Sequence, residues 1–297
     1  MSCLLLAALA DAGAVAEVPQ QLVVPSAWLS GRLADPSFVV LHLANLREDY
    51  SREHIPGARF LWPSWLAVST PERSFEMMAV DTLRAVCERL GVSNNSQVVI
   101  CHSLGDIAAA ARVYVTLDYL GMGERTVILD GGLEAWKAAG NPVTQEVPKY
   151  APGSFAPKLR QDALVDLEYV KSKYRSEDVR LVDSRSAIAF NLAEGVGIYR
   201  GGHIPRAVNI PFSAIEDSLH RYQPLDSLRA VFERAGIKPG MEIITYCTMG
   251  RVACPAYVAA KMLGYEVRLY DGSYEEWSRR EDLPIEIAAT RDENRAL

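Results

Sequence analysis

The sequence lacks the features that mark membrane, nucleic-acid-binding and disulfide-rich proteins. It has 297 residues and only five cysteines. That count is odd and no two cysteines have metal-ligand spacing, so neither a disulfide scaffold nor a zinc site is predicted. No apolar run reaches the roughly 18 residues of a transmembrane helix. No basic run occurs and the formal net charge is −6, which argues against nucleic acid or an anionic membrane as a partner.

What is present describes an ordinary globular protein. Hydrophobic residues make up 49% of the chain and charged residues 23%, which is enough apolar material for well-packed cores. A chain of this length is long for one domain and comfortable for two of about 100–150 residues each.

The N-terminus allows two interpretations. Residues 3–10 are apolar, and residues 14–16 (AVA) resemble the cleavage site of a signal peptide. However, no positive charge precedes the apolar stretch, and Asp11 interrupts it. A short N-terminal helix is therefore slightly favoured. We expect a cytoplasmic protein, with a periplasmic or exported one as the alternative if residues 1–16 are a signal peptide.

An internal repeat organises the chain. Residues 81–91 (DTLRAVCERLG) recur as residues 226–236 (DSLRAVFERAG), at an offset of 145 residues (226 minus 81). Three further pairs follow in the same order: residues 54–58 with 203–207, 98–102 with 243–247, and 130–136 with 271–277. Collinear matches of this kind indicate two copies of one fold.

Each copy alternates short β-branched runs with helical segments. The expected strands are residues 38–41, 98–101 and 126–129 in the first copy and 181–182, 242–246 and 267–270 in the second. Helices are expected near residues 81–90 and 108–120, each followed by a glycine. Strands that alternate with helices pair in parallel through right-handed crossovers. The predicted fold class is α/β, with two tandem domains that each contain a parallel β-sheet flanked by helices.

The duplication also predicts the domain boundaries. We expect an N-terminal domain at residues 18–144 and a C-terminal domain at residues 161–288. The linker of residues 145–160 contains three prolines and lacks apolar periodicity. The tail after Ile287 is polar and is expected to be loose.

One stretch of the second copy combines a strand, a cysteine and the start of a helix. Residues 243–246 predict a buried strand that leads directly into Cys247, and a helix is expected to begin in residues 253–256. Backbone N–H groups of the loop and the helix dipole would both favour the thiolate, which is the reactive form. A buried structural cysteine is the alternative at this position, and the comparison of the two copies decides between them.

The two copies differ at this point. Superposition of the repeats places His102 opposite Cys247, so only the second copy has a sulfur where the strand meets the loop. Cys101 falls opposite Tyr246 and should point to the other face of the strand, into the core. Without a recognisable carboxylate beside His102, the first copy is interpreted as inactive. Cys247 is expected at the bottom of an interdomain cleft, beyond the carboxyl ends of the strands.

These motifs together resemble the rhodanese family, in the form of a two-domain sulfurtransferase. The resemblance covers the chain from about residue 22 to residue 287. It rests on the duplicated His-Ile-Pro motifs, residues 181–185 (LVDSR), residues 209–212 (NIPF), the cysteine loop, and residues 270–273 (YDGS) with Trp277. It implies transfer of a sulfane sulfur through a persulfide on Cys247. An inactive N-terminal domain is also typical of the family, and His102 agrees with it.

The loop chemistry suits this reaction. An anionic donor such as thiosulfate or mercaptopyruvate must approach a thiolate, and loop N–H groups, the helix N-terminus and a cation would offset the repulsion. A thiol, cyanide or a small redox protein then removes the sulfur, which predicts ping-pong kinetics without a metal or organic cofactor. The loop residues expected to bind the donor are Thr248, Met249, Gly250, Arg251 and Val252.

Two further arginines are candidates for substrate binding. Arg185 follows Asp183 at a strand end, where its guanidinium could bind the donor's anionic group bidentately. A structural pair with Asp183 or another carboxylate is the alternative, and the resemblance favours substrate contact. Arg200 is the other candidate, although the two glycines after it leave its placement open.

Three side chains are expected to have structural roles. His54 and His203 each precede Ile-Pro and should hydrogen-bond locally to fix their loops. Cys254 lies seven residues after Cys247 and is expected to pack in the helix, with a disulfide under oxidation as the alternative.

The loop departs from both donor classes of the family. Mercaptopyruvate enzymes usually carry Cys-Gly-Ser/Thr-Gly-Val-Thr and thiosulfate enzymes often Cys-Arg-Lys-Gly-Val-Thr, whereas residues 247–252 are CTMGRV. Met249 replaces both the Ser/Thr and the Lys, while Arg251 supplies a cation two residues later. A second family arginine is also missing, with alanine and phenylalanine at residues 189–190. Thiosulfate is therefore favoured as the donor, with 3-mercaptopyruvate as the alternative.

Two other functional classes fit the sequence less well. A cysteine phosphatase would need an arginine at position 253, which is Ala253. A non-catalytic sulfur-binding or sensing module would be expected to lose the cysteine from both copies, and Cys247 is present. The sequence thus predicts a monomeric sulfurtransferase that moves sulfur from thiosulfate to cyanide or a thiol through Cys247.

Overall fold

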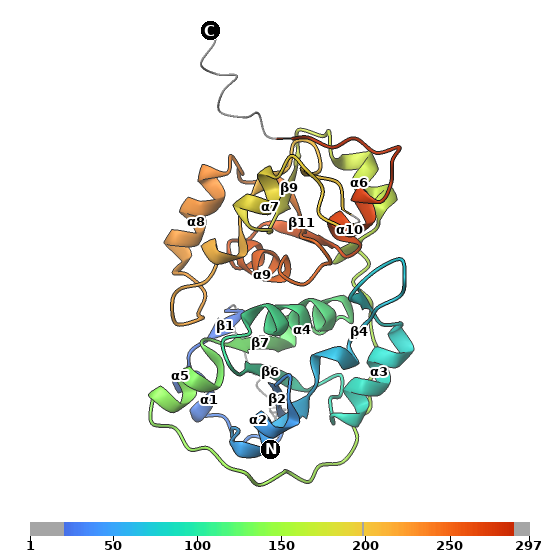
Figure 1. The fold of residues 1–297 in the computed structure, drawn as a ribbon. Helices are drawn as coiled ribbons and strands as arrows, with labels where there is room; N and C mark the ends of the chain where they lie inside the picture. Colours follow the sequence, from blue (N-terminus) through green and yellow to red (C-terminus); the bar gives the residue numbers. More distant parts are fainter. Residues whose placement is uncertain (1–20, 198, 288–297) are drawn as a thin grey trace, which may run out of the picture.

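The computed structural model describes residues 21–197 and 199–287, which form two domains of the same architecture (Figure 1). The interpretations of residues 1–16 and of the tail after Ile287 lie outside this range. Within it, no helix has the length and apolar character needed to cross a membrane.

The N-terminal domain is built on a five-stranded parallel sheet with the order β1-β7-β6-β2-β3. Its strands are β1 (Val23–Val24), β2 (Phe38–Leu43), β3 (Arg59–Leu61), β6 (Gln97–His102) and β7 (Thr126–Leu129). Its helices are α1 (Ser26–Ser30), α2 (Arg47–Arg52), α3 (Val80–Arg89), α4 (Ile107–Tyr119) and α5 (Gly132–Ala138), with the 3₁₀ helices η1 (Pro63–Trp65) and η2 (Gly123–Arg125). An antiparallel hairpin outside the sheet pairs β4 (Ala67–Val68) with β5 (Glu76–Met77).

The C-terminal domain repeats this plan with the strand order β10-β9-β11-β12-β8, again all parallel. Its strands are β8 (Leu164–Val165), β9 (Val179–Asp183), β10 (Val208–Asn209), β11 (Glu242–Tyr246) and β12 (Glu266–Tyr270). Its helices are α6 (Leu167–Lys173), α7 (Ala187–Asn191), α8 (Leu225–Arg234), α9 (Cys254–Met262) and α10 (Ser273–Ser278), with the 3₁₀ helix η3 (Phe212–Ala214). The predicted tandem α/β fold is confirmed. The edge strands β1, β3, β8 and β10 were not predicted from the sequence, because each has only two or three residues.

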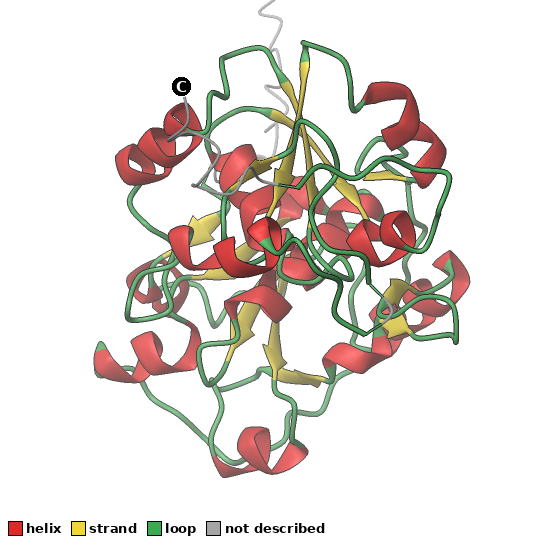
Figure 2. Ribbon diagram, turned by 45° about the horizontal axis from the view of Figure 1, so that its top comes forward, coloured by secondary structure: helices red, strands yellow, loops and turns green. Residues whose placement is uncertain are grey.

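Helices cover both faces of each sheet (Figure 2). Side chains of the central strands therefore alternate between two cores. Tyr246 packs in the core on one face of the second sheet, while Cys247 joins the core on the other face. In the first sheet, Cys101 is fully buried in the core that corresponds to that of Tyr246. The prediction that Cys101 is a core residue is confirmed.

The helices α4 and α9 occupy equivalent places in the two domains and pack against each other between the sheets (Figure 1). Tyr114 of α4 and Tyr257 of α9 belong to one hydrophobic core that continues from one domain into the other. Nearly every residue of α4 is buried, because one side of the helix meets its own sheet and the other meets the partner domain. That explains why its sequence is apolar all around rather than amphipathic.

A buried carboxylate joins both domains and the segment between them. Asp118 on α4 accepts hydrogen bonds from the Tyr257 hydroxyl at 2.7 Å and from Lys261 Nζ at 2.7 and 2.9 Å, both on α9. It also accepts one from Arg160 Nη1 at 2.8 Å, from the segment that precedes β8. A carboxylate out of water requires such partners.

Asp118→Asn is therefore expected to lower the free energy of unfolding by about 1–3 kcal/mol, since it removes the charge that these donors share. Urea unfolding followed by circular dichroism measures the change. Asp282→Asn is the matched control, because Asp282 forms an exposed pair with Arg280, and such pairs contribute little to stability. Equal stability losses in both variants would contradict the proposed importance of Asp118.

Each domain also extends a loop over the other (Figure 1). The backbone N–H of Met77, in the β4–β5 hairpin, donates to Asp271 at 2.9 Å. In the opposite direction, the N–H of Tyr222 donates to Asp130 at 3.2 Å. Asp130 and Asp271 open the same repeated motif, so the two contacts are counterparts. These reciprocal contacts hold the domains together on both sides of the α4–α9 packing.

The segment of residues 145–160 contains no helix or strand. It runs along the N-terminal domain, where the N–H of Gly153 donates to the Glu88 carbonyl at 2.7 Å and that of Lys158 to the Leu120 carbonyl at 3.2 Å. Phe155 is buried against the same domain.

Candidate active site

Cys247 lies where β11 ends and only 1% of its surface is exposed. A loop of residues 247–253 follows, and α9 begins at Cys254. The predicted strand–loop–helix arrangement is confirmed. Cys254 is itself buried in the first turn of the helix, with Sγ 3.1 Å from the Gly250 carbonyl. All four cysteines in the part of the chain that the structure describes are free thiols.

The loop surrounds the sulfur with backbone donors. Burial is the largest influence on the Cys247 thiol and raises its pKa above the ordinary value. The N–H groups of Met249, Val252 and Ala253 donate toward Sγ, and these hydrogen bonds lower the pKa of the thiol against the effect of burial. The predicted N–H cradle is present, and Ala253 was not foreseen as part of it. The loop N–H groups favour the thiolate as expected, but loss of hydration outweighs the three donors, so the pKa of Cys247 is raised overall.

Gly250 makes the tight turn of the loop. Its φ is +75°, and a Cβ there would lie 2.8 Å from the Asp271 carbonyl. Both the left-handed backbone and the close approach require glycine. The carbonyl of Gly250 accepts a hydrogen bond from Arg112 Nη1 at 3.3 Å, so the turn is held from the other domain.

The turn between β12 and α10 forms hydrogen bonds with the backbone of the cysteine loop. The N–H of Cys247 donates to Ser273 Oγ at 3.3 Å, and the Cys247 carbonyl accepts from the N–H of Tyr274 at 3.0 Å. The N–H of Glu275 donates to the Thr248 carbonyl at 2.9 Å. In the sequence, residues 270–273 stood out only as a motif, and the structure shows that Ser273 and the two residues after it fix the backbone of Cys247 and Thr248.

Arg112 is the main residue that the sequence analysis missed. It lies on α4 of the first domain, is buried, and donates to the Asp271 carboxylate, to the Gly250 carbonyl and, at 3.1 Å, to the Phe75 carbonyl. Burial opposes its charge, but Asp271 and the Cys254 sulfur hold its pKa above the ordinary value. The only signal in the sequence is a lone arginine in an apolar helix.

Arg185 forms a close ion pair with its neighbour Asp183. Nε donates to both carboxylate oxygens at 2.9 and 3.0 Å, and Nη2 donates to Oδ2 at 2.6 Å and to the Gly202 carbonyl at 2.9 Å. The guanidinium also lies 3.9 Å from the centre of the Tyr274 ring. The structural pair, which was the alternative interpretation, is therefore present, and substrate contact by Arg185 stays a prediction.

Arg200 binds backbone carbonyls at and beyond the end of α10. Nε donates to Ser278 at 2.8 Å, and Nη2 donates to Arg280 at 2.7 Å and Leu283 at 3.1 Å. These contacts satisfy carbonyls that the helix end leaves without partners. This geometry gives no support to the predicted substrate contact.

Arg251 points toward the first domain. Its Nη2 donates to both oxygens of Asp106, at 2.7 and 2.6 Å. The two residues are 145 positions apart, which is the offset of the repeat, so equivalent positions of the two loops form an ion pair. The positive charge predicted beside Cys247 is present, and in this arrangement a carboxylate neutralises it.

The first domain has His102 at the place of Cys247. Its ring is buried and neither ring nitrogen has a hydrogen-bond partner. Burial lowers its pKa to about 4, so the ring is neutral at pH 7. That this domain is inactive stays a prediction. The two other predicted histidine roles are confirmed, since Nδ1 of His54 donates to the Tyr50 carbonyl at 2.8 Å and Nδ1 of His203 to the Phe190 carbonyl at 3.0 Å.

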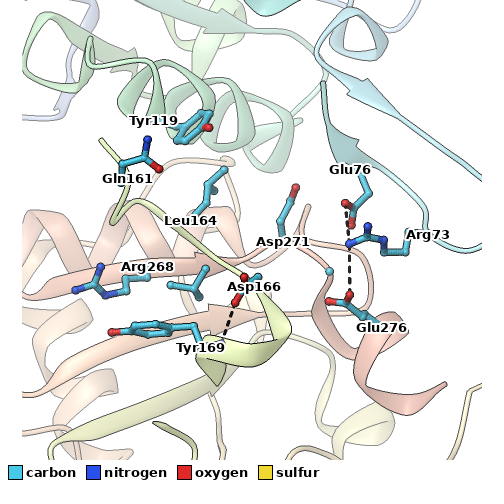
Figure 3. Close-up of a pocket in the computed structure, with 12 residues that line it drawn as sticks. Arg73, Glu76, Tyr119, Gln161, Leu164, Asp166, Tyr169, Arg268, Asp271 and Glu276 are labelled. Carbon is cyan, nitrogen blue, oxygen red and sulfur yellow. Dashed lines mark hydrogen bonds and ion pairs between the residues drawn. The ribbon is translucent and has the colours of Figure 1, made fainter. Parts of the chain in front are cut away.

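A cavity of about 430 Å³ lies between the domains (Figure 3). At one side of it, Arg73 from the first domain forms an ion pair with Glu276 of the second. Asp271 lines this cavity, but Cys247 does not. The expected interdomain cavity is therefore present, and the placement of Cys247 at its bottom is wrong for this closed arrangement. Among the described residues, no three His, Cys, Asp or Glu side chains cluster as a metal site.

Comparison with known proteins places both halves of the chain in one family. The sequence model of the rhodanese-like domain matches residues 26–139 and again residues 166–280. A protein named thiosulfate sulfurtransferase from Azotobacter vinelandii is 31% identical over 90% of this chain and 97% of its own length. The 3-mercaptopyruvate sulfurtransferase of Escherichia coli is 28% identical over 87% of this chain and 95% of its own.

Solved structures show the same fold. An anaerobic ergothioneine biosynthesis enzyme from Chlorobium limicola superposes with a TM-score of 0.80 over 91% of this chain and 71% of its own, at 24% identity. At that identity the likeness concerns the fold alone. The two domain matches and the relatives of similar length agree with the duplicated architecture described above. The chain belongs to the rhodanese family, as a member with two rhodanese-like domains in tandem.

Proposed function

We propose that this protein is a sulfurtransferase that takes a sulfane sulfur from thiosulfate onto Cys247 and passes it to cyanide or a thiol. The observation that carries the proposal is the cysteine itself, placed at the end of β11 with three backbone N–H groups directed at its sulfur. The first domain has His102 in the equivalent place and contributes structure rather than a second nucleophile.

The reaction would proceed in two steps. The Cys247 thiolate attacks the outer sulfur of thiosulfate, the S–S bond of the donor breaks, and sulfite leaves with the electron pair. The N–H groups of Met249, Val252 and Ala253, which donate toward Sγ in the structure, would stabilise negative charge on the resulting persulfide. Cyanide then attacks the terminal sulfur, thiocyanate forms, and the thiolate returns. In both steps the protein supplies Cys247 and the N–H groups of its loop.

Thiosulfate is the proposed donor and 3-mercaptopyruvate the alternative. Arg251 supplies a cation in the loop, while Met249 stands where mercaptopyruvate enzymes carry a hydroxyl. The proposed partners are a small anionic donor and a thiol, cyanide or small redox-protein acceptor, with the protein acting as a monomer. Neither nucleic acid nor a membrane is a proposed partner. The proposed location is the cytoplasm, or the periplasm if residues 1–16 are a signal peptide.

Separate incubation with thiosulfate and with 3-mercaptopyruvate tests the proposal. Intact mass is expected to rise by one sulfur atom, and addition of cyanide should release thiocyanate with ping-pong kinetics and a higher kcat/KM for thiosulfate. A higher kcat/KM for mercaptopyruvate would identify the alternative donor. Absence of the one-sulfur adduct with both donors would favour a non-catalytic module and contradict the proposed function.

A further inference from the structure

Three arginines surround the cysteine loop, and each of them is neutralised by a carboxylate. Arg112 pairs with Asp271, Arg185 with Asp183, and Arg251 with Asp106. An anionic donor that approaches a thiolate needs a positive charge that is available to it. In the structure none of these three guanidinium groups is unpaired, so a donor that binds one of them must displace its carboxylate.

Burial decides which pair can open. The side chains of Arg112 and Asp271 are 3% and 14% exposed, and those of Arg185 and Asp183 are 8% and 0% exposed. Separation of such pairs leaves a charge without water or partner and is costly. Arg251 and Asp106 are 34% and 21% exposed. Water can replace the partner there, so this pair separates at the smallest cost.

Asp106 is held in place independently of the arginine. Its Oδ1 accepts the N–H of Ala109 at 3.0 Å and so caps the N-terminus of α4. Asn45 Nδ2 lies 3.4 Å from the other oxygen. Arg251 has no comparable anchor among the described contacts, because both of its hydrogen bonds go to Asp106. When the pair opens, the arginine is the side chain that moves.

We propose that Asp106, in the domain without the cysteine, sets the affinity of the site for anionic donors by competing with them for Arg251. In the resting protein Asp106 holds the guanidinium, and the bound donor replaces that carboxylate. The inference rests on the proposed function only in taking the donor to be an anion. It gives the loop that follows His102 a role in donor selection.

Asp106→Asn tests this competition, because asparagine keeps an oxygen that caps α4 and removes the charge. The KM for thiosulfate is expected to fall about two- to five-fold with kcat changed less than two-fold, as suits a partly exposed ion pair. In an Arg251→Gln background the same substitution should leave KM unchanged. Asp282→Asn, which removes an exposed carboxylate paired with Arg280, controls for the change in net charge. An unchanged or raised KM in Asp106→Asn, or an equal fall in the Arg251→Gln background, would overturn the proposal.

A binding measurement separates this inference from the proposed function. In the Cys247→Ser protein no turnover occurs, and calorimetry with sulfate as an unreactive divalent anion reports the affinity of the site. Asp106→Asn is expected to lower the sulfate Kd about two- to five-fold, and only when Arg251 is present. Failure of thiosulfate turnover in the parent protein would contradict the proposed function alone. An unchanged sulfate Kd would overturn the competition between Asp106 and the anion.

Discussion

Cys247→Ser is expected to abolish sulfur uptake, with a loss of thiocyanate formation on the order of 10³-fold or more. A serine hydroxyl is a poor nucleophile at neutral pH and cannot form a persulfide. The site otherwise stays intact, because the backbone hydrogen bonds of Cys247 to Ser273 and Tyr274 do not involve the sulfur. Intact mass after incubation with thiosulfate measures uptake directly, and a cyanide assay measures transfer.

The matched control for this variant is Cys87→Ala. Cys87 is also a buried free thiol, but it lies on α3 and packs in the core of the first domain. This variant should take up one sulfur atom like the parent protein. Turnover of Cys247→Ser at the parental rate, or loss of the adduct in Cys87→Ala with the fold intact, would show that Cys247 is not the nucleophile.

Arg112→Met is expected to lower the free energy of unfolding by about 3–5 kcal/mol, because it leaves the Asp271 carboxylate without its buried partner. Methionine keeps the length of the side chain but cannot donate to Asp271, Gly250 or Phe75. Since the Gly250 carbonyl belongs to the cysteine loop, kcat for sulfur transfer should fall as well. Urea unfolding and the cyanide assay measure the two effects.

Two further variants test whether the unpaired Asp271 carboxylate causes the loss of stability. The double variant Arg112→Met with Asp271→Asn should recover part of the stability, since no unpaired charge remains and asparagine still accepts the N–H of Met77. Arg84→Met is the matched control, because its pairs on α3 are exposed and should contribute less than about 1 kcal/mol. Parental stability in Arg112→Met, or no recovery in the double variant, would contradict the role of the buried pair.

The contact between the two loops changes how the first domain is understood. That domain lacks the cysteine, yet it contributes Arg112 to the turn at Gly250 and Asp106 to the side chain of Arg251. A domain with a histidine at the place of Cys247 thus still contacts the cysteine loop across the interface. The β4–β5 hairpin and the loop before α8 also reach over to the opposite domain.

Local sequence determined the fold and the position of the proposed nucleophile. The repeat at an offset of 145 residues predicted two domains of one architecture, and strand periodicity separated Cys101 from the position of Cys247. The cysteine loop was predictable because a strand, a glycine turn and a helix start follow one another within about a dozen residues. These features depend on neighbours in the chain, where backbone geometry links residue order directly to structure.

Only the tertiary structure decided the electrostatics of the site. Asp271 lies 159 positions from Arg112, and Asp106 lies 145 positions from Arg251, so nothing in the local sequence pairs them. Burial raises the pKa of Cys247, whereas the local loop and helix alone favour its thiolate. Burial and ion pairing depend on which surfaces the two domains bring together when α4 packs against α9, and the order of residues around the cysteine does not contain that information.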